Sequence, residues 1–232
     1  MNYLIWNGRD SREIKGLVIC ELPPISKPPM RVAETVIDGV DGSIIEELGY
    51  ESYDKSFTIG LTQKADIEEI IGYFTGNGEV VFGNEGDKYY KARIIGQIDY
   101  ARLARFKVAS VTFRVQPFKY EYMEEDAPYD VTGINSLTVD NVGNYHAKPV
   151  IEMKGSGEVT LAVNGNTMFR YTFPDGEDTV VIDSQRQDAD EGAILKNRNM
   201  SGEFPTFSAG ENMITWEGNV SSLKITSKSR WL

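Results

Sequence analysis

The second half of the chain places turn residues and β-favourable residues in close alternation, and this pattern restricts the fold more than any other feature. From about Ser136, β-branched and aromatic residues occur in short runs separated by Gly, Asn, Asp and Pro. Strands need the former to fill a pleated, half-buried face, and turns need Gly and Asn because these tolerate positive φ. No helical periodicity appears there, so the sequence predicts a β-sandwich with turns at 154–158 and 218–219. The predicted strands are 137–139, 148–153, 157–163, 168–173, 179–184, 192–196, 212–216 and 223–227.

The first half adds one predicted helix to further strands. Its apolar residues are spaced i, i+3, i+4 and i+7, which places them on one face: Ile67, Ile70, Ile71 and Phe74. Thr62 is the predicted N-cap, and the Gly-Asn-Gly sequence at 76–78 ends the helix. We interpret the apolar stripe as packing on a sheet. The predicted strands of this half are 3–6, 16–22, 31–37, 43–48, 53–61, 79–82, 89–98 and 105–118.

Residues 31–48 are the part of the first half that says most about function. Two β-favourable runs flank the sequence Asp-Gly-Val-Asp-Gly at 38–42, whose Asp-Gly pairs are strong hairpin signals. The hairpin has few apolar residues, and a two-stranded hairpin is marginally stable alone. It therefore packs either on its own domain or on a neighbouring subunit, and we favour the neighbour. The predicted oligomer-interface residues of this hairpin arm are Arg31, Val36, Ile37, Ile44 and Ile45.

Length and composition allow either one large β domain or two small ones. The chain has 232 residues, of which 41% are hydrophobic, and this is sufficient for a core without disulfides. An acidic, turn-rich stretch at 119–130 has little apolar periodicity and marks the predicted boundary. We predict a mainly β protein. Its N-terminal β-sandwich-like domain, with one helix and the arm, spans 1–130, and a C-terminal β-sandwich spans 131–232.

The charge of the chain argues against a nucleic-acid-binding protein. The formal net charge is −11, and the acidic residues are spread along the chain. Affinity for a nucleic-acid backbone comes mainly from basic contacts, so a chain this acidic should not hold DNA well. A negative surface that repels phosphate suits a passage for DNA better than a binding site.

Cysteine content and hydropathy bear on the cellular context. Cys20 is the only cysteine, so no intrachain disulfide can form, and its place in the apolar run 17–20 predicts a buried thiol. The first residues turn polar too early for a secretory signal, and no apolar stretch approaches the roughly 18 residues of a membrane span. We expect a protein that is made and folded in a cytoplasm and does not insert into a membrane.

No motif for catalysis, cofactor binding or metal binding stands out. His146 is the only histidine, so a His cluster cannot form, and no G-x-S-x-G sequence occurs. The acidic run at 183–192 lacks the spacing of a calcium loop, and no phosphate-binding glycine pattern lies between a strand and a helix. The 35 acidic residues offer many carboxylate pairs of the kind that glycosidases use, but nothing singles out one pair. We therefore predict a binding or structural protein that has no enzymatic activity, no cofactor and no metal.

Three ordered stretches of the second half resemble the distal tail protein (Dit) family of long-tailed bacteriophages and prophages. The first is NVGNYHAKPVIEMKGSGEVTLAVNG at 141–165, and the second is TVVIDS at 179–184. The third is GEFPTFSAGENMITWEGNVSSLKITSKSR at 202–230, which matches the closing strands of the family's second domain. The first half fits the family by the order of its elements: an early strand pair, a long hairpin arm, one helix on a sheet and a final long strand.

The resemblance implies a structural role in the virion. Dit-like proteins form a hexameric ring at the tail tip, between the major tail tube protein and the tail-associated hub protein. Their first domains surround a channel for DNA and the tape measure. Their second domains are galectin-like β-sandwiches, which in some phages dock receptor-binding proteins. The expected location is therefore the tail tip of a virion assembled in the host bacterial cytoplasm. Many relatives carry sugar-binding insertions, for which this chain has no room.

Two other classes of protein remain open at this point. A carbohydrate-binding module for attachment to the host cell surface would use aromatic rings to stack on sugars, and the available residues are Tyr145, Tyr171, Trp216 and Trp231. Alternatively, Tyr171 and Trp216 point into the core by strand alternation. A glycosidase-like enzyme is disfavoured, because no acid pair is marked.

Overall fold

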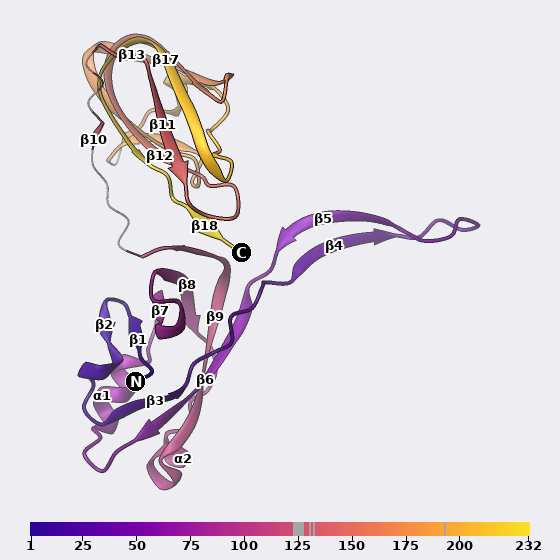
Figure 1. Cartoon of the computed structure of the whole chain (residues 1–232), viewed down its shortest axis with the longest axis vertical. Helices are drawn as coiled ribbons and strands as arrows, with labels where there is room; N and C mark the ends of the chain where they lie inside the picture. Colours follow the sequence, from indigo (N-terminus) through magenta and orange to yellow (C-terminus); the bar gives the residue numbers. More distant parts are fainter. Residues whose placement is uncertain (123–127, 130, 132, 193) are drawn as a thin grey trace. The chain divides into compact units, whose positions relative to one another are not determined.

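The computed structural model describes residues 1–122, 128–129, 131, 133–192 and 194–232 (Figure 1). The chain divides into two compact units, Met1–Tyr122 and Met123–Trp231. Asp130, at which the sequence places the end of the first domain, lies outside the described residues. Both units are built mainly of strands, which confirms the predicted mainly β fold class.

The first unit is organised around an antiparallel sheet with an apolar core. Short 3₁₀ turns, Ser11–Glu13 and Gly83–Glu85, follow two of its strands. Alternate residues of its long strands are buried, as the two-residue period of a strand requires. The strands lie in the order β2 (Arg9–Asp10), β1 (Leu4–Trp6), β7 (Asn77–Phe82), β8 (Lys88–Ile94), β9 (Val108–Glu121), β6 (Tyr53–Leu61) and β3 (Leu17–Glu21).

Helix α1, Ile67–Tyr73, lies where the apolar stripe predicts a helix. Ile70 and Phe74 are buried in the core of the unit. The N-cap is Asp66 and not Thr62, because the Asp66 carboxylate accepts hydrogen bonds from the backbone N–H groups of Glu68 and Glu69 at 3.1 and 3.3 Å. The predicted cap was therefore wrong by one turn.

A second helix, α2 (Tyr100–Phe106), was not predicted, so the expectation of a single helix was wrong. The sequence suggested that a strand begins at residue 105, but β9 begins at Val108. Lys107 adopts a positive φ of 62° and donates its N–H to the Leu103 carbonyl at 2.8 Å. This left-handed residue ends the helix and turns the chain into the strand.

Cys20 is exposed, whereas the sequence predicted a buried thiol. It lies on β3, which is the last strand of the sheet and pairs with β6 alone in the strand order. Leu17 and Ile19 fill the inner face of β3, so the alternation of the strand turns Cys20 outward.

The second unit is a curled antiparallel sheet whose longest strands each join two predicted strands. These are β12 (Val150–Val163), β13 (Asn166–Asp183) and β17 (Gly210–Thr226). The pairing register shifts between Gly155 and Gly157 and between Ser156 and Thr160, so 154–158 is a bulge and not the predicted turn. Gly218, with a φ of 105°, lies within β17, so the turn predicted at 218–219 was also wrong.

Shorter elements complete the second unit around one apolar core. The strand order is β10, β17, β12, β13, β14 and β15, with β11 paired to β17 and β16 paired to β13. The remaining bounds are β10 (Pro128–Tyr129), β11 (Ser136–Asn141), β14 (Asp188–Glu191), β15 (Ile194–Leu195), the 3₁₀ turn Asn197–Asn199, β16 (Met200–Gly202) and β18 (Arg230–Trp231). Curled sheets of this kind are consistent with the predicted sandwich.

Candidate functional site

The hairpin arm is a two-stranded sheet of its own. Strands β4 (Met30–Thr35) and β5 (Ile44–Tyr50) pair with each other and with no other described strand. Figure 1 shows the pair extending away from the sheet of the first unit, with the turn at its far end. The arm therefore offers both of its faces and both of its edges to a partner.

The apolar residues of the arm are exposed to an extent that is unusual for aliphatic side chains. Of the residues predicted to form an oligomer interface, Val36 is 70%, Ile44 60% and Ile45 62% exposed, and Ile37 is 47% exposed. The prediction omitted three further exposed residues of the arm: Val32, Val40 and Leu48. Exposed apolar groups that gather in this way mark surfaces that bind partners.

Arg31 plays a part within the arm. Its Nη2 donates a hydrogen bond to the Leu48 carbonyl at 2.9 Å and so joins the two strands at the base of the hairpin. This contact gives Arg31 a role in ordering the arm, and a contact of Arg31 with a neighbouring subunit stays a prediction.

The pairing register divides the arm into two faces. Val32 stands opposite Glu47 and Glu34 opposite Ile45, and strand alternation places all four side chains on one face. We call this the acidic arm face. The opposite face carries Ala33, Thr35, Ile44 and Glu46. Between residues 30 and 50 the chain has five carboxylates against one guanidinium, a net charge of −4.

The segment that leads from the sheet into the arm is held by side chains of the body of the unit. The Asn84 amide donates to the Pro23 carbonyl at 3.0 Å, the Lys55 ammonium to the Pro24 carbonyl at 2.8 Å and the Tyr53 hydroxyl to the Ser26 carbonyl at 3.2 Å. Residues 22–29 belong to no strand, so these three bonds satisfy carbonyls that no sheet ladder reaches. We call this segment the arm root.

A buried charged cluster stands behind the arm root. Glu85 accepts hydrogen bonds from the Lys119 ammonium at 2.8 Å and from the Tyr90 hydroxyl at 2.5 Å. Lys55 is buried, with only 2% of the residue exposed, and its ammonium lies 4.9 Å from the centre of the Tyr90 ring. Burial lowers the pKa of Lys55 to about 8; Glu85 opposes this shift, and the neighbouring Lys119 adds to it.

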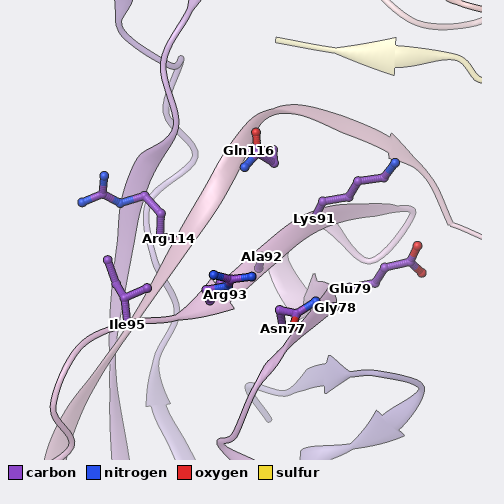
Figure 2. Close-up of a pocket in the computed structure, with 9 residues that line it drawn as sticks. All are labelled: Asn77, Gly78, Glu79, Lys91, Ala92, Arg93, Ile95, Arg114 and Gln116. Atoms are coloured by element: carbon purple, nitrogen blue, oxygen red, sulfur yellow. The ribbon is translucent and has the colours of Figure 1, made fainter. Parts of the chain in front are cut away.

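A shallow hollow of about 630 Å³ lies on the outer face of β7, β8 and β9. Lys91 and Arg93 alternate with buried residues along β8, so both side chains are exposed. Figure 2 shows them with Arg114 of β9 and with Ile95, which is 54% exposed. We call this the basic sheet face, and it was not predicted, because its residues are far apart in the sequence.

The four aromatic residues proposed to contact sugar do not form one surface. Tyr171 is fully buried and Trp216 is 4% exposed, so neither ring is available to stack on a sugar in this fold. Tyr145 is half-buried, with its ring 4.1 Å from the His146 ring and 5.3 Å from the Arg230 guanidinium. Trp231 is half-buried on β18. Tyr171 and Trp216 instead point into the core of the second unit, as strand alternation allowed.

Neither a metal site nor a membrane span was found among the described residues. No group of three or more His, Cys, Asp or Glu side chains in this part of the chain could hold a metal ion. The helices that the structure describes are too short or too polar to cross a bilayer. The pKa of His146 is lowered by burial and by the nearby Arg230 and Lys148.

The fold is similar to that of a solved phage protein over its full length. The SPP1 Dit protein, described as a paradigm of the hub adsorption apparatus in phages that infect Gram-positive bacteria, aligns with a TM-score of 0.71 at 13% identity. The alignment covers 100% of both chains. The phage p2 baseplate in its activated conformation with Sr aligns with a TM-score of 0.47 at 8% identity, over 97% of each chain. No family model and no curated protein sequence matches this chain significantly. The first comparison confirms that the chain has a Dit-like fold.

Proposed function

We propose that this chain is a structural protein of a phage tail tip, in which six copies form a ring that joins the tail tube to the baseplate. The proposal is supported by the full-length similarity of the fold to SPP1 Dit. The observation that carries it is the hairpin arm, whose exposed Ile44 and Ile45 gain burial only from a partner. A stable contact between copies needs roughly 1,000 Å² of buried surface or more, and an arm of this length can supply a large share.

The proposed partners follow from this position. They are further copies of the chain, the major tail tube protein and the tail-associated hub protein, and in some phages a receptor-binding protein on the second unit. DNA passes through the ring without specific binding, which is consistent with a net charge of −11. The chain acts in the virion tail tip after assembly in the host cytoplasm, and its role requires no catalysis and no cofactor.

Carbohydrate binding has less support as a function. Tyr171 and Trp216, two of the four rings that would stack on a sugar, are buried in the core of the second unit. A glycan-binding surface would therefore depend on Tyr145 and Trp231 alone.

The test is the particle mass in solution, measured by light scattering with negative-stain images of the same sample. We expect a ring with a central hole for the natural chain and a monomer for I44D/I45D, because two carboxylates cannot be buried without partners. The matched control is I194D/L195D, since Ile194 and Leu195 form an equally exposed aliphatic pair, at 63% and 65%, in the second unit. A ring that survives I44D/I45D would overturn the role of the arm.

A further inference from the structure

The basic sheet face carries a charge arrangement that the first unit itself does not balance. Arg93 stands directly opposite Arg114 across β8 and β9, and like charges in opposite positions destabilise a sheet. On its other side Arg93 stands opposite Asn77 of β7. No carboxylate therefore faces Arg93 on either neighbouring strand.

The other two cations of this face have acidic neighbours. The Arg114 guanidinium pairs with the Asp54 carboxylate, with Nε 2.5 Å from Oδ1 and Nη2 3.2 Å from Oδ2. Lys91 stands opposite Glu79 across β7 and β8. Arg93 is therefore the cation of the hollow that an added carboxylate would stabilise most.

The acidic arm face has the complementary chemistry. Its two carboxylates, Glu34 and Glu47, lie diagonally across the hairpin, and each stands opposite an aliphatic residue. The basic sheet face likewise combines cations with an exposed aliphatic side chain, Ile95. Both surfaces combine charged and apolar side chains. In a contact between them, the carboxylates of the arm can pair with the cations of the sheet, and the aliphatic side chains of the two surfaces can bury each other.

We propose that the basic sheet face receives the hairpin arm of a second copy, with Glu34 and Glu47 directed at Arg93 and Arg114. Val32 and Ile45 of the arm then pack toward Ile95. This inference rests on the proposed ring and names the surface on which the arm lies. The contact gives Arg93 the carboxylate that neither neighbouring strand supplies, so assembly gains an interaction that the single chain cannot make.

A nucleic acid fits the same face less well. A nucleic acid brings a continuous row of phosphates, some of which would fall beside Glu79 and Asp54, whereas the acidic arm face brings only two carboxylates. The exposed Ile95 would remain without a partner on a polyanion. An arm with alternating carboxylates and aliphatic residues meets both requirements.

The charges can be tested by reversal and exchange. We expect R93E to raise the concentration needed for assembly by at least about tenfold, and E34R/E47R to do the same, because each places like charges together in the contact. The chain that carries all three changes should recover most of the assembly. The control is K64E, at an exposed loop lysine, which should not change the mass.

A crosslink tests the position directly. In a Cys20→Ser background, chains with E34C and chains with R93C are mixed and treated with a short bismaleimide. We expect a covalent pair that contains one chain of each kind. The control mixture of E46C and R93C should give much less, because position 46 lies on the face turned away.

The outcomes separate this inference from the proposed function. If I44D/I45D dissolves the ring while R93E leaves it intact and no crosslink forms, the ring stands and the docking face is wrong. If the natural chain is a monomer at every concentration, both are wrong. If R93E leaves the ring intact but weakens the binding of a labelled DNA duplex, the face binds nucleic acid and the docking proposal is overturned.

Discussion

Arg93 shows how one side chain can lower the stability of the single chain. It stands opposite Arg114, and a carboxylate at this position would convert repulsion into attraction. We expect R93E to raise the free energy of unfolding of the first unit by about 0.2–1 kcal/mol, the usual contribution of a favourable cross-strand pair. Chemical unfolding should be measured in the I44D/I45D background, in which assembly does not contribute.

The matched variant for this prediction is R93Q. Glutamine removes the repulsion without adding an attraction, so its stability should lie between those of arginine and glutamate. If the R93E chain were less stable than the R93Q chain, the electrostatic potential at position 93 would not be dominated by Arg114.

At the scale of elements, the bulges of the second unit depend on glycine. A Cβ at Gly218 would lie 2.3 Å from the Glu158 carbonyl oxygen, and the φ of 105° is already unfavourable for other residues. We expect G218A to lower the free energy of unfolding of the second unit by more than about 1 kcal/mol. Urea unfolding can be followed by tryptophan fluorescence in a W6F background, in which the remaining tryptophans, Trp216 and Trp231, both belong to the second unit.

Gly157 provides the comparison for G218A. It has a φ of 71°, but no atom lies within 4 Å of a Cβ placed there. G157A therefore introduces backbone strain without a clash, and its effect should be the smaller of the two. Equal effects would mean that strain alone accounts for the requirement at both positions.

The same glycines show which elements can be read from a sequence. Strand alternation located β6 at its observed bounds, and apolar spacing located α1. Glycine and serine at 154–158 predicted a turn, but a bulge uses the same residues, and only the strand opposite decides between the two. Helix α2 has one fully buried apolar residue, Leu103, which is too weak a stripe to predict a helix.

The candidate site divides in a similar way. The arm was predicted because a turn signal and a low apolar content are local properties of 31–48. The basic sheet face was not, because Arg93 and Arg114 become neighbours only through the pairing of β8 with β9. The burial of Tyr171 and Trp216 likewise depends on which face of the long strands points inward.

At the scale of the whole molecule, salt should act on assembly in two opposite ways. Each copy has a net charge of −11, so copies repel one another over the roughly 30 Å Debye length of 0.01 M salt. We expect the assembled fraction to rise toward 0.1 M, where this length is about 10 Å, and to fall toward 1 M, where contacts between arm and sheet are themselves screened. Light scattering at a fixed protein concentration across this range gives the curve.

The shape of the curve of assembled fraction against salt concentration distinguishes long-range repulsion, ion pairs and apolar contacts. A maximum at intermediate salt indicates long-range repulsion combined with short-range ion pairs. An assembled fraction that keeps rising to 1 M would mean that apolar contacts alone hold the copies together. In R93E chains the fall above 0.1 M should be weaker, because one of the screened pairs is absent.

The arm root has a consequence for the geometry of a closed ring. Asn84, Lys55 and Tyr53 hold three carbonyls of the arm root through bonds within the single chain, so the direction in which the arm leaves the body is set when the chain folds. In a ring of identical copies each junction turns by the same angle, about 60° for six members. If the chain assembles as proposed, the exit direction of the arm would help to set the angle between neighbouring copies, and loss of the three hydrogen bonds at its base would allow rings of mixed size.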